Sequence, residues 1–171
     1  MTERIVYQSA SLLLCYPGDD WPETLSLVSR SIAAVRGAAA RSLARFCERA
    51  AGTGTPLDLG ARYVATFDRT RRRTLYLTYY TDGDTRTRGG RLASLKAYYR
   101  RHGWVGPDRE LPDFLPLMLE FAARDPEAGR PLLADHRPGL DMLRRGLRAY
   151  GSDYEHVLDA VCAAVPEGRR R

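Results

Sequence analysis

Apolar residues recur at every third or fourth position along most of this chain, which is the spacing of an amphipathic α-helix. Glycine and proline separate the periodic stretches and indicate turns between helices. Asp125-Pro126 marks another such boundary, after which a new segment begins. The predicted helical segments are residues 3–15, 20–35, 38–51, 58–67, 84–101, 112–122, 140–150 and 153–165.

Polar residues near the starts of several segments have the spacing of helix caps. Asp20 with Glu23 resembles a capping box, and Asp58 and Asp153 precede the apolar repeats of their own segments. Pro112 fits the first turn of a helix, where a missing N–H costs least. We therefore expect helices to begin at these positions.

The segment Leu75–Tyr80 is ambiguous. Its large side chains alternate with a period of two, which taken alone favours a strand. A solitary strand would have no obvious partner in this sequence, and an unpaired strand is not stable. We therefore predict a helix here, broken at Asp82-Gly83-Asp84.

The length of the chain and the absence of repeats favour one domain. A chain of 171 residues with 44% hydrophobic residues is long enough to bury an ordinary core. No repeat of fixed period and no low-complexity tract is found. We expect an all-α, single-domain helical bundle over residues 1–168, followed by a basic tail at residues 169–171.

The formal net charge of +6 suggests a nucleic-acid partner, but the type of cation weakens this reading. Lys96 is the only lysine, and the sequence contains no asparagine, so the arginine content reflects a bias along the whole chain. The alternative function that stays open is a helical nucleic-acid-binding protein that uses its Arg-rich surface. Tyr98-Tyr99 beside Arg100-Arg101 would be its contact region.

The sequence indicates a cytoplasmic protein. No apolar run approaches the ~18 residues that span a bilayer. The Leu12–Leu14 triplet follows the acidic Glu3 and is too short for a secretory signal. The three cysteines lie in apolar stretches and are expected to be buried thiols in a reducing compartment. They are Cys15, Cys47 and Cys162.

No motif for catalysis, metal binding or nucleotide binding is found. The histidines, His102, His136 and His156, lack the spacing of metal ligands. Glu110, Asp113 and Glu120 could form an acid–base set, but near a proline-started helix Asp113 more plausibly stabilises the helix dipole. We predict no catalytic residues and no metal site, and a cofactor-handling enzyme is the last of three hypotheses.

The segment 75–86 instead combines aromatic and apolar side chains with two carboxylates, a mixture suited to gripping a peptide. This segment and three others resemble the nitrate reductase assembly chaperones, also called the delta subunit, within the redox-enzyme maturation chaperone family. The resembling blocks are residues 8–17, 63–73, 75–88 and 110–121. Many members of the wider family have a histidine where this chain has Phe114, which places the chain in the nitrate reductase branch.

The resemblance implies an all-helical cytoplasmic chaperone that is not an enzyme. Such a protein binds the apo catalytic (alpha) subunit of respiratory nitrate reductase, chiefly at its N-terminal leader peptide. It keeps that subunit competent for insertion of the molybdenum cofactor and iron–sulfur clusters before membrane docking. It holds no cofactor stably, and cofactor-delivery proteins are further candidate partners. Neither nucleic acid nor membrane insertion is expected.

An amphipathic leader helix would need an apolar groove with a few polar anchors. The alternative for each apolar candidate is ordinary core packing, and for each charged candidate a turn, cap or solvated role. The candidate peptide-binding residues are Tyr76, Leu77, Tyr79, Tyr80, Asp82, Asp84, Leu115, Leu119 and Glu120. Arg71, Arg72, Arg73, Arg86 and Arg88 are candidates for contacts with acidic partner surface or the cofactor's pyrophosphate. Glu110, Pro112 and Asp113 are expected to set the start of their helix.

Overall fold

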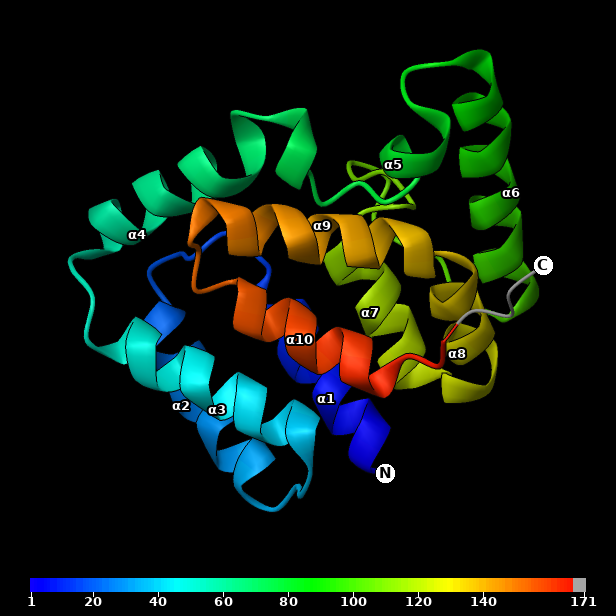
Figure 1. Cartoon of the computed structure of the whole chain (residues 1–171). Helices are drawn as coiled ribbons and strands as arrows, with labels where there is room; N and C mark the ends of the chain where they lie inside the picture. Colours follow the sequence, from blue (N-terminus) through cyan, green and yellow to red (C-terminus); the bar gives the residue numbers. More distant parts are fainter. Residues whose placement is uncertain (168–171) are drawn as a thin grey trace.

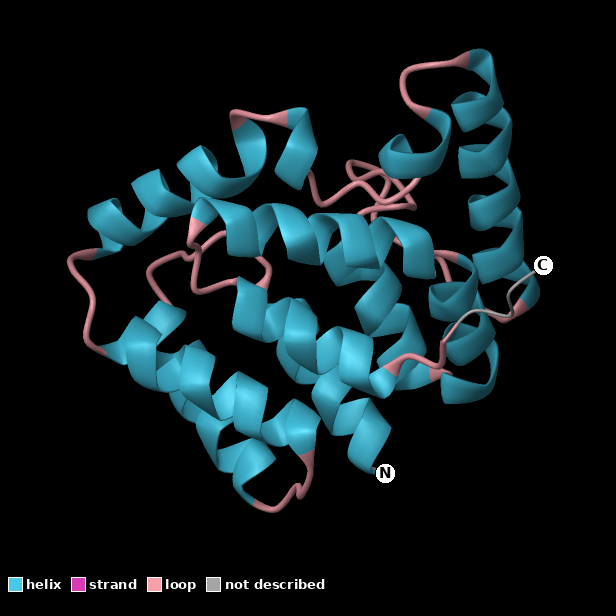
Figure 2. Cartoon of the chain, viewed as in Figure 1, coloured by secondary structure: helices cyan, strands magenta, loops and turns pink. Residues whose placement is uncertain are grey.

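The periodic segments form helices in the structure, a computed structural model that describes residues 1–167 (Figure 1). Figure 2 shows helices joined by loops, so the predicted all-α class is confirmed. A π-helical turn, Val64–Asp68, and a 3-10 turn, Arg71–Arg73, follow α4. The helices are α1 Thr2–Leu13, α2 Trp21–Ala33, α3 Ala38–Ala51, α4 Pro56–Tyr63, α5 Tyr79–Asp82, α6 Arg86–Arg101, α7 Leu115–Arg124, α8 Pro126–Asp135, α9 Arg137–Tyr150 and α10 Glu155–Ala164.

Helix α1 lies at the centre of the bundle and packs against α7, α10 and α2. Its buried face includes Tyr7, which is fully buried and whose hydroxyl donates to the Ala164 carbonyl of α10 at 3.1 Å. The Ser11 hydroxyl donates to the Pro116 carbonyl of α7 at 2.7 Å. These bonds satisfy polar groups that would otherwise cost free energy in the core. They therefore fix α1 to both neighbours.

Two helices, α4 and α6, lie at opposite sides of the bundle in Figure 1. Tyrosine hydroxyls at their C-terminal ends tie them to the rest of the chain. Tyr63 of α4 donates to the Leu14 carbonyl at 2.8 Å. Tyr98 of α6 donates to the Ala128 carbonyl at 2.9 Å and Tyr99 to the Pro112 carbonyl at 2.6 Å. Each ring is apolar enough to enter the core while its hydroxyl finds an acceptor.

Three predicted caps are wrong in detail. Asp20 precedes α2, but its backbone is not extended and its side chain makes no cap bond. Thr55, and not Asp58, is the N-cap of α4. Asp58 is the third residue of the helix and completes the capping box, and hydrogen bonds from Thr55 lower the pKa of its carboxyl. Asp153 lies one residue before the N-cap of α10, Tyr154, makes no cap bond, and forms an ion pair with Arg49.

The predicted helix over Leu75–Tyr80 is wrong for its first four residues. Tyr76 forms an isolated antiparallel bridge with Phe114, Leu77 and Thr78 form a turn, and helix α5 begins only at Tyr79. The partner that the sequence did not suggest comes from a loop that precedes α7. Two backbone bonds close the bridge, Leu77 N to Asp113 O at 3.1 Å and Leu115 N to Leu75 O at 2.8 Å.

The same bridge displaces the start of the following helix. Pro112 was expected in the first turn, but α7 begins at Leu115 after an extended Phe114, and Pro116 occupies the first turn instead. The chain cannot be helical at Phe114 while it pairs with Tyr76. The predicted tail at residues 169–171 lies outside the described residues. Within residues 1–167, no helix has both the length and the apolar character needed to cross a bilayer.

Helices α7 and α8 approach so closely that a glycine is required between them. A Cβ added to Gly129 of α8 would overlap the backbone and side chain of Ala122. We expect Gly129→Ala to lower the free energy of unfolding by about 1–3 kcal/mol, since overpacking displaces the backbone. Gly90→Ala, in an exposed turn of α6 with nothing within 4 Å, should instead raise it by about 0.5–1 kcal/mol. Urea denaturation measures both, and equal midpoints for the two variants would contradict the close packing.

Candidate functional site

The fully buried carboxylate of Asp113 joins the two segments that the sequence singled out. Its Oδ2 accepts from Thr78, at 3.2 Å from the backbone N–H and 2.6 Å from the hydroxyl. Arg88 lies against the same oxygen at 3.4 Å and also donates to the Thr78 hydroxyl at 3.1 Å. A buried charge is tolerated only when it is paired and hydrogen-bonded in this way. Asp113 therefore holds three segments together and does not serve the dipole of α7.

Glu110 fixes the ring of Tyr76. The Tyr76 hydroxyl donates to Glu110 Oε1 at 2.8 Å, and the Leu111 backbone N–H donates to the same oxygen at 3.0 Å. The Tyr76 ring packs on Phe114 with centroids 5.3 Å apart. Burial, the Glu110 bond and nearby carboxylates raise the pKa of Tyr76, so the phenol stays neutral and remains a donor. Tyr76 thus forms a rigid, half-buried platform.

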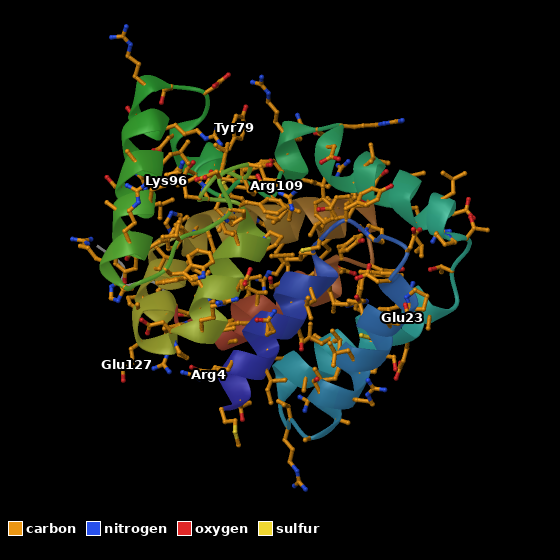
Figure 3. All side chains as sticks on the ribbon, turned by 180° about the vertical axis from the view of Figure 1, so that it is seen from behind. Arg4, Glu23, Tyr79, Lys96, Arg109 and Glu127 are labelled. Carbon is orange, nitrogen blue, oxygen red and sulfur yellow. The ribbon has the colours of Figure 1, made fainter. Side chains whose placement is uncertain are left out.

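The two neighbouring tyrosines of α5 point in different directions. Tyr79 is half-exposed, and Figure 3 shows it projecting outward from the surface. Its hydroxyl accepts from Arg71 at 3.2 Å. Tyr80 packs against Gly139 of α9 and donates to the Thr74 carbonyl at 2.8 Å. Tyr79 is therefore available to a partner, whereas Tyr80 has a structural role.

The two aspartates of the turn also differ. The side chain of Asp82 is 6% exposed and pairs with Arg91 at 2.6 Å, so it is not available to a partner. The side chain of Asp84 is 75% exposed and lies 4.0 Å from Arg71, a weak contact in water. Of the two predicted acidic anchors, Asp84 is the accessible one.

The three leucines expected in the groove walls do not reach the surface. Leu77, Leu115 and Leu119 are 0% exposed and belong to the core. They cannot contact a peptide while the chain keeps this conformation, because bundle helices cover them. Glu120, on the same helix as two of them, is partly exposed and pairs with Arg124 at 2.8 Å.

The predicted arginine contacts fall into two groups. Arg73 donates to the Thr66 and Ala65 carbonyls at 2.8 and 3.3 Å, and its guanidinium lies 3.7 Å from the centroid of the Tyr150 ring. It therefore fixes the 3-10 turn to α9. The guanidinium of Arg88 already pairs with Asp113 through Nη2. Arg71, Arg72 and Arg86 are exposed.

An acidic surface that the sequence analysis missed surrounds the C-terminal end of α1. Cys15 is exposed there rather than buried, and its thiol donates to the Ser11 carbonyl at 3.3 Å. Although the residue is exposed, its Sγ lies against the Ser11 carbonyl and is partly removed from water. This desolvation, followed by the charges of Glu120, Asp20 and Glu110, raises the pKa of the thiol to about 11. A thiol with this pKa is a poor nucleophile near neutral pH. Cys47 and Cys162 are buried as predicted.

Aromatic rings accompany these carboxylates. Tyr16 is 58% exposed and packs edge-on against Tyr63, with centroids 5.4 Å apart. Burial is the main cause of the raised pKa of both Tyr63 and Tyr76, and the charge of Asp68 adds to it in both cases. We call this region the acidic aromatic face, and it comprises Tyr16, Asp68, Tyr76, Glu110 and Glu120. Tyr16 and Asp68 lie inside resembling blocks, which was the signal that could have identified them.

The described part of the chain contains no group of three or more His, Cys, Asp and Glu residues placed to hold a metal ion. The tyrosines of the nucleic-acid alternative also have internal roles. Tyr99 is 2% exposed, and the ring of Tyr98 packs against His102 and Phe121 with centroids 4.7 and 6.1 Å apart. Both rings are therefore engaged within the protein, whereas that hypothesis needs rings free to stack on bases.

The fold is that of a redox-enzyme maturation protein. The structure of such a protein from Archaeoglobus fulgidus superposes with a TM-score of 0.68 and 20% identity, covering 94% of this chain and 91% of that one. Residues 30–157 match the family described as nitrate reductase delta subunit. The chain belongs to this family, and the predicted resemblance is confirmed.

Two curated relatives differ in how much of their length the chain covers. The nitrate reductase-like protein NarX of Mycobacterium tuberculosis is 42% identical over 159 residues, which are 92% of this chain but 24% of that protein. The chain therefore spans about a quarter of that relative. The Bacillus subtilis protein named probable nitrate reductase molybdenum cofactor assembly chaperone NarJ is 34% identical over 95% of this chain and 89% of its own length.

We expect Asp113→Ala to lower the free energy of unfolding by about 3 kcal/mol, because it leaves Arg88 and Thr78 without their buried acceptor. Combined with Arg88→Met, the loss should be at least about 1 kcal/mol smaller than the sum of the single losses, because the two residues interact. Urea denaturation of the four proteins completes the cycle.

The exposed Asp84→Ala is the control and should change stability by less than about 0.5 kcal/mol. Strict additivity of Asp113→Ala and Arg88→Met would show that the two side chains are not coupled.

Proposed function

We propose that this protein is a chaperone for the maturation of respiratory nitrate reductase. It binds the apo alpha subunit chiefly at the N-terminal leader peptide, and it acts in the cytoplasm without catalysing a reaction. Family membership supports this proposal, and so does the name of the Bacillus subtilis relative, which covers nearly the same length. In this role the molybdenum cofactor and iron–sulfur clusters are cargo of the client and need no resident site in this chain.

The acidic aromatic face is the observation that carries the proposal. The chain has a formal net charge of +6, yet carboxylates from three separate segments gather on this face. A local charge opposite to the net charge favours a basic partner by charge complementarity and not by general attraction. An amphipathic leader helix that carries Lys or Arg on its polar side has the required chemistry.

The aromatic residues of this face suit the apolar side of such a helix. Tyr16 and Tyr76 present rigid rings with polar tips, which give contact area at little cost in conformational entropy. Leu111, which is 41% exposed, extends the apolar area beside Tyr76. Because Glu110 fixes the Tyr76 ring before any partner arrives, little ordering is needed on binding.

The buried leucines constrain how the peptide is held. Leu77, Leu115 and Leu119 support the face from behind, and the peptide rests on the side chains above them. The proposed contact set is therefore Tyr76, Tyr79, Asp84 and Glu120 from the sequence prediction, together with Tyr16, Asp68 and Glu110. Cofactor-delivery proteins are proposed as additional partners of the chaperone–client complex.

Removal of two charges from this face should weaken leader binding. Isothermal titration calorimetry with a synthetic peptide of the alpha subunit's N-terminal sequence measures the dissociation constant. Glu110→Gln combined with Glu120→Gln should raise it about tenfold, equivalent to ~1.4 kcal/mol, because two charge-assisted contacts are lost while side-chain shape is kept.

Glu127→Gln provides the matched control. Glu127 is exposed on α8 and lies far from Tyr79 in Figure 3, so its neutralisation should change the dissociation constant less than twofold. No detectable peptide binding to the unmodified chain at tens of micromolar would overturn the proposed function. An equal loss in the control would overturn the assignment of the face.

A further inference from the structure

A hollow of about 280 Å³ opens beside the acidic aromatic face, and its polar lining is of the opposite kind. Two arginines and two hydroxyl groups line it, and one carboxylate lies at its edge. These residues are Arg71, Arg88, Thr74, Tyr79 and Asp84. Leu111 and Tyr76 complete the lining, and the Tyr76 hydroxyl already donates to Glu110. We propose that this hollow binds an oxyanion, either a phosphate or a carboxylate group of a ligand.

Arg88 supplies a pre-positioned cation. Its Nε and Nη2 are held by the Thr78 hydroxyl at 3.1 Å and by Asp113 at 3.4 Å. The side chain is 18% exposed, so its position is set before any ligand arrives. Among the described residues none accepts from Nη1, which leaves that end of the guanidinium for the hollow. A planar guanidinium with a free edge is well suited to phosphate or carboxylate oxygens.

The two hydroxyl groups are oriented as donors. The Tyr79 hydroxyl accepts from Arg71 Nη1 at 3.2 Å, and the Thr74 hydroxyl accepts from the Tyr76 backbone N–H at 3.3 Å. A hydroxyl that already accepts one bond keeps its hydrogen to donate. The hollow thus combines two guanidinium groups with two hydroxyl donors, and this set favours an acceptor-rich, negatively charged group.

Asp84 would compete weakly with an external anion for Arg71. Its carboxylate lies 4.0 Å from Arg71, and both side chains are about three-quarters exposed. An exposed pair at this separation contributes little to stability, and the carboxylate can move away at small cost. An external oxyanion would replace it as the partner of Arg71. Removing the Asp84 charge should therefore strengthen binding, a result that general loss of structure would not produce.

The test uses the full chain and two probes. Amide chemical shifts are followed by NMR while sodium pyrophosphate, or in a second arm sodium glutarate, is added at constant ionic strength maintained with sodium chloride. We expect saturable shifts confined to residues near the hollow, with a dissociation constant on the order of 1 mM or tighter. Saturation by pyrophosphate alone assigns the site to a phosphate-bearing ligand, and saturation by glutarate assigns it to a carboxylate group.

Four variants separate a specific site from general attraction. Arg71→Gln and Tyr79→Phe should each weaken binding about fivefold or more, and Asp84→Asn should strengthen it about twofold. Arg72→Gln makes the same charge change at the next residue, which does not line the hollow, and should alter affinity less than twofold. These substitutions are at exposed or half-exposed side chains, and retention of the fold is checked by the unfolding midpoint.

The absence of saturable shifts with both probes would overturn the proposal. So would an equal weakening by Arg72→Gln and Arg71→Gln, because it would reveal only diffuse attraction to a basic surface. The proposal does not rest on the proposed chaperone function: the probes are small anions, and the carboxylates tested with the leader peptide lie outside the hollow's polar lining. Either proposal can therefore fail while the other stands.

Discussion

The buried carboxylate of Asp113 is the constraint on which the candidate site depends. A charge with no access to water must be paired, and its partners come from Thr78 and Arg88, 35 and 25 residues earlier in the chain. These bonds to Asp113 Oδ2 accompany a single bridge between Tyr76 and Phe114, after which the chain turns at Leu77 and Thr78 into α5. This arrangement turns Tyr76 toward Glu110, buries Leu77 beneath it and leaves one edge of Arg88 toward the hollow.

Two surfaces of opposite character therefore adjoin one another around the Tyr76 ring. On one side, carboxylates and exposed rings form the acidic aromatic face, and on the other, guanidinium and hydroxyl donors line the hollow. The formal net charge of the chain describes neither surface, because interactions between exposed charges fade within about 8–10 Å at physiological salt. Local geometry, and not the net charge, therefore sets the character of each surface.

The sequence predicted the helices well because their apolar faces repeat locally, and it predicted the caps poorly. A helix start depends on one backbone conformation, and α10 begins one residue later than the expected cap requires, so Asp153 lies before the N-cap and pairs with the distant Arg49. The resembling blocks identified the family correctly. They did not separate the roles of adjacent residues: Tyr79 and Tyr80 differ by one position, yet one faces solvent and the other packs against Gly139 of α9.

The sequence by itself determined the all-α class, the approximate helix positions and the family, because periodicity and motif are properties of neighbouring residues. The tertiary structure alone decided that Tyr76 pairs with Phe114, that three candidate leucines lie in the core, and that Tyr16 and Asp68 join Glu110 on one face. These outcomes depend on contacts between residues tens of positions apart. No local pattern encodes such contacts, since each arises only when buried polar groups in separate segments find partners in the packed bundle.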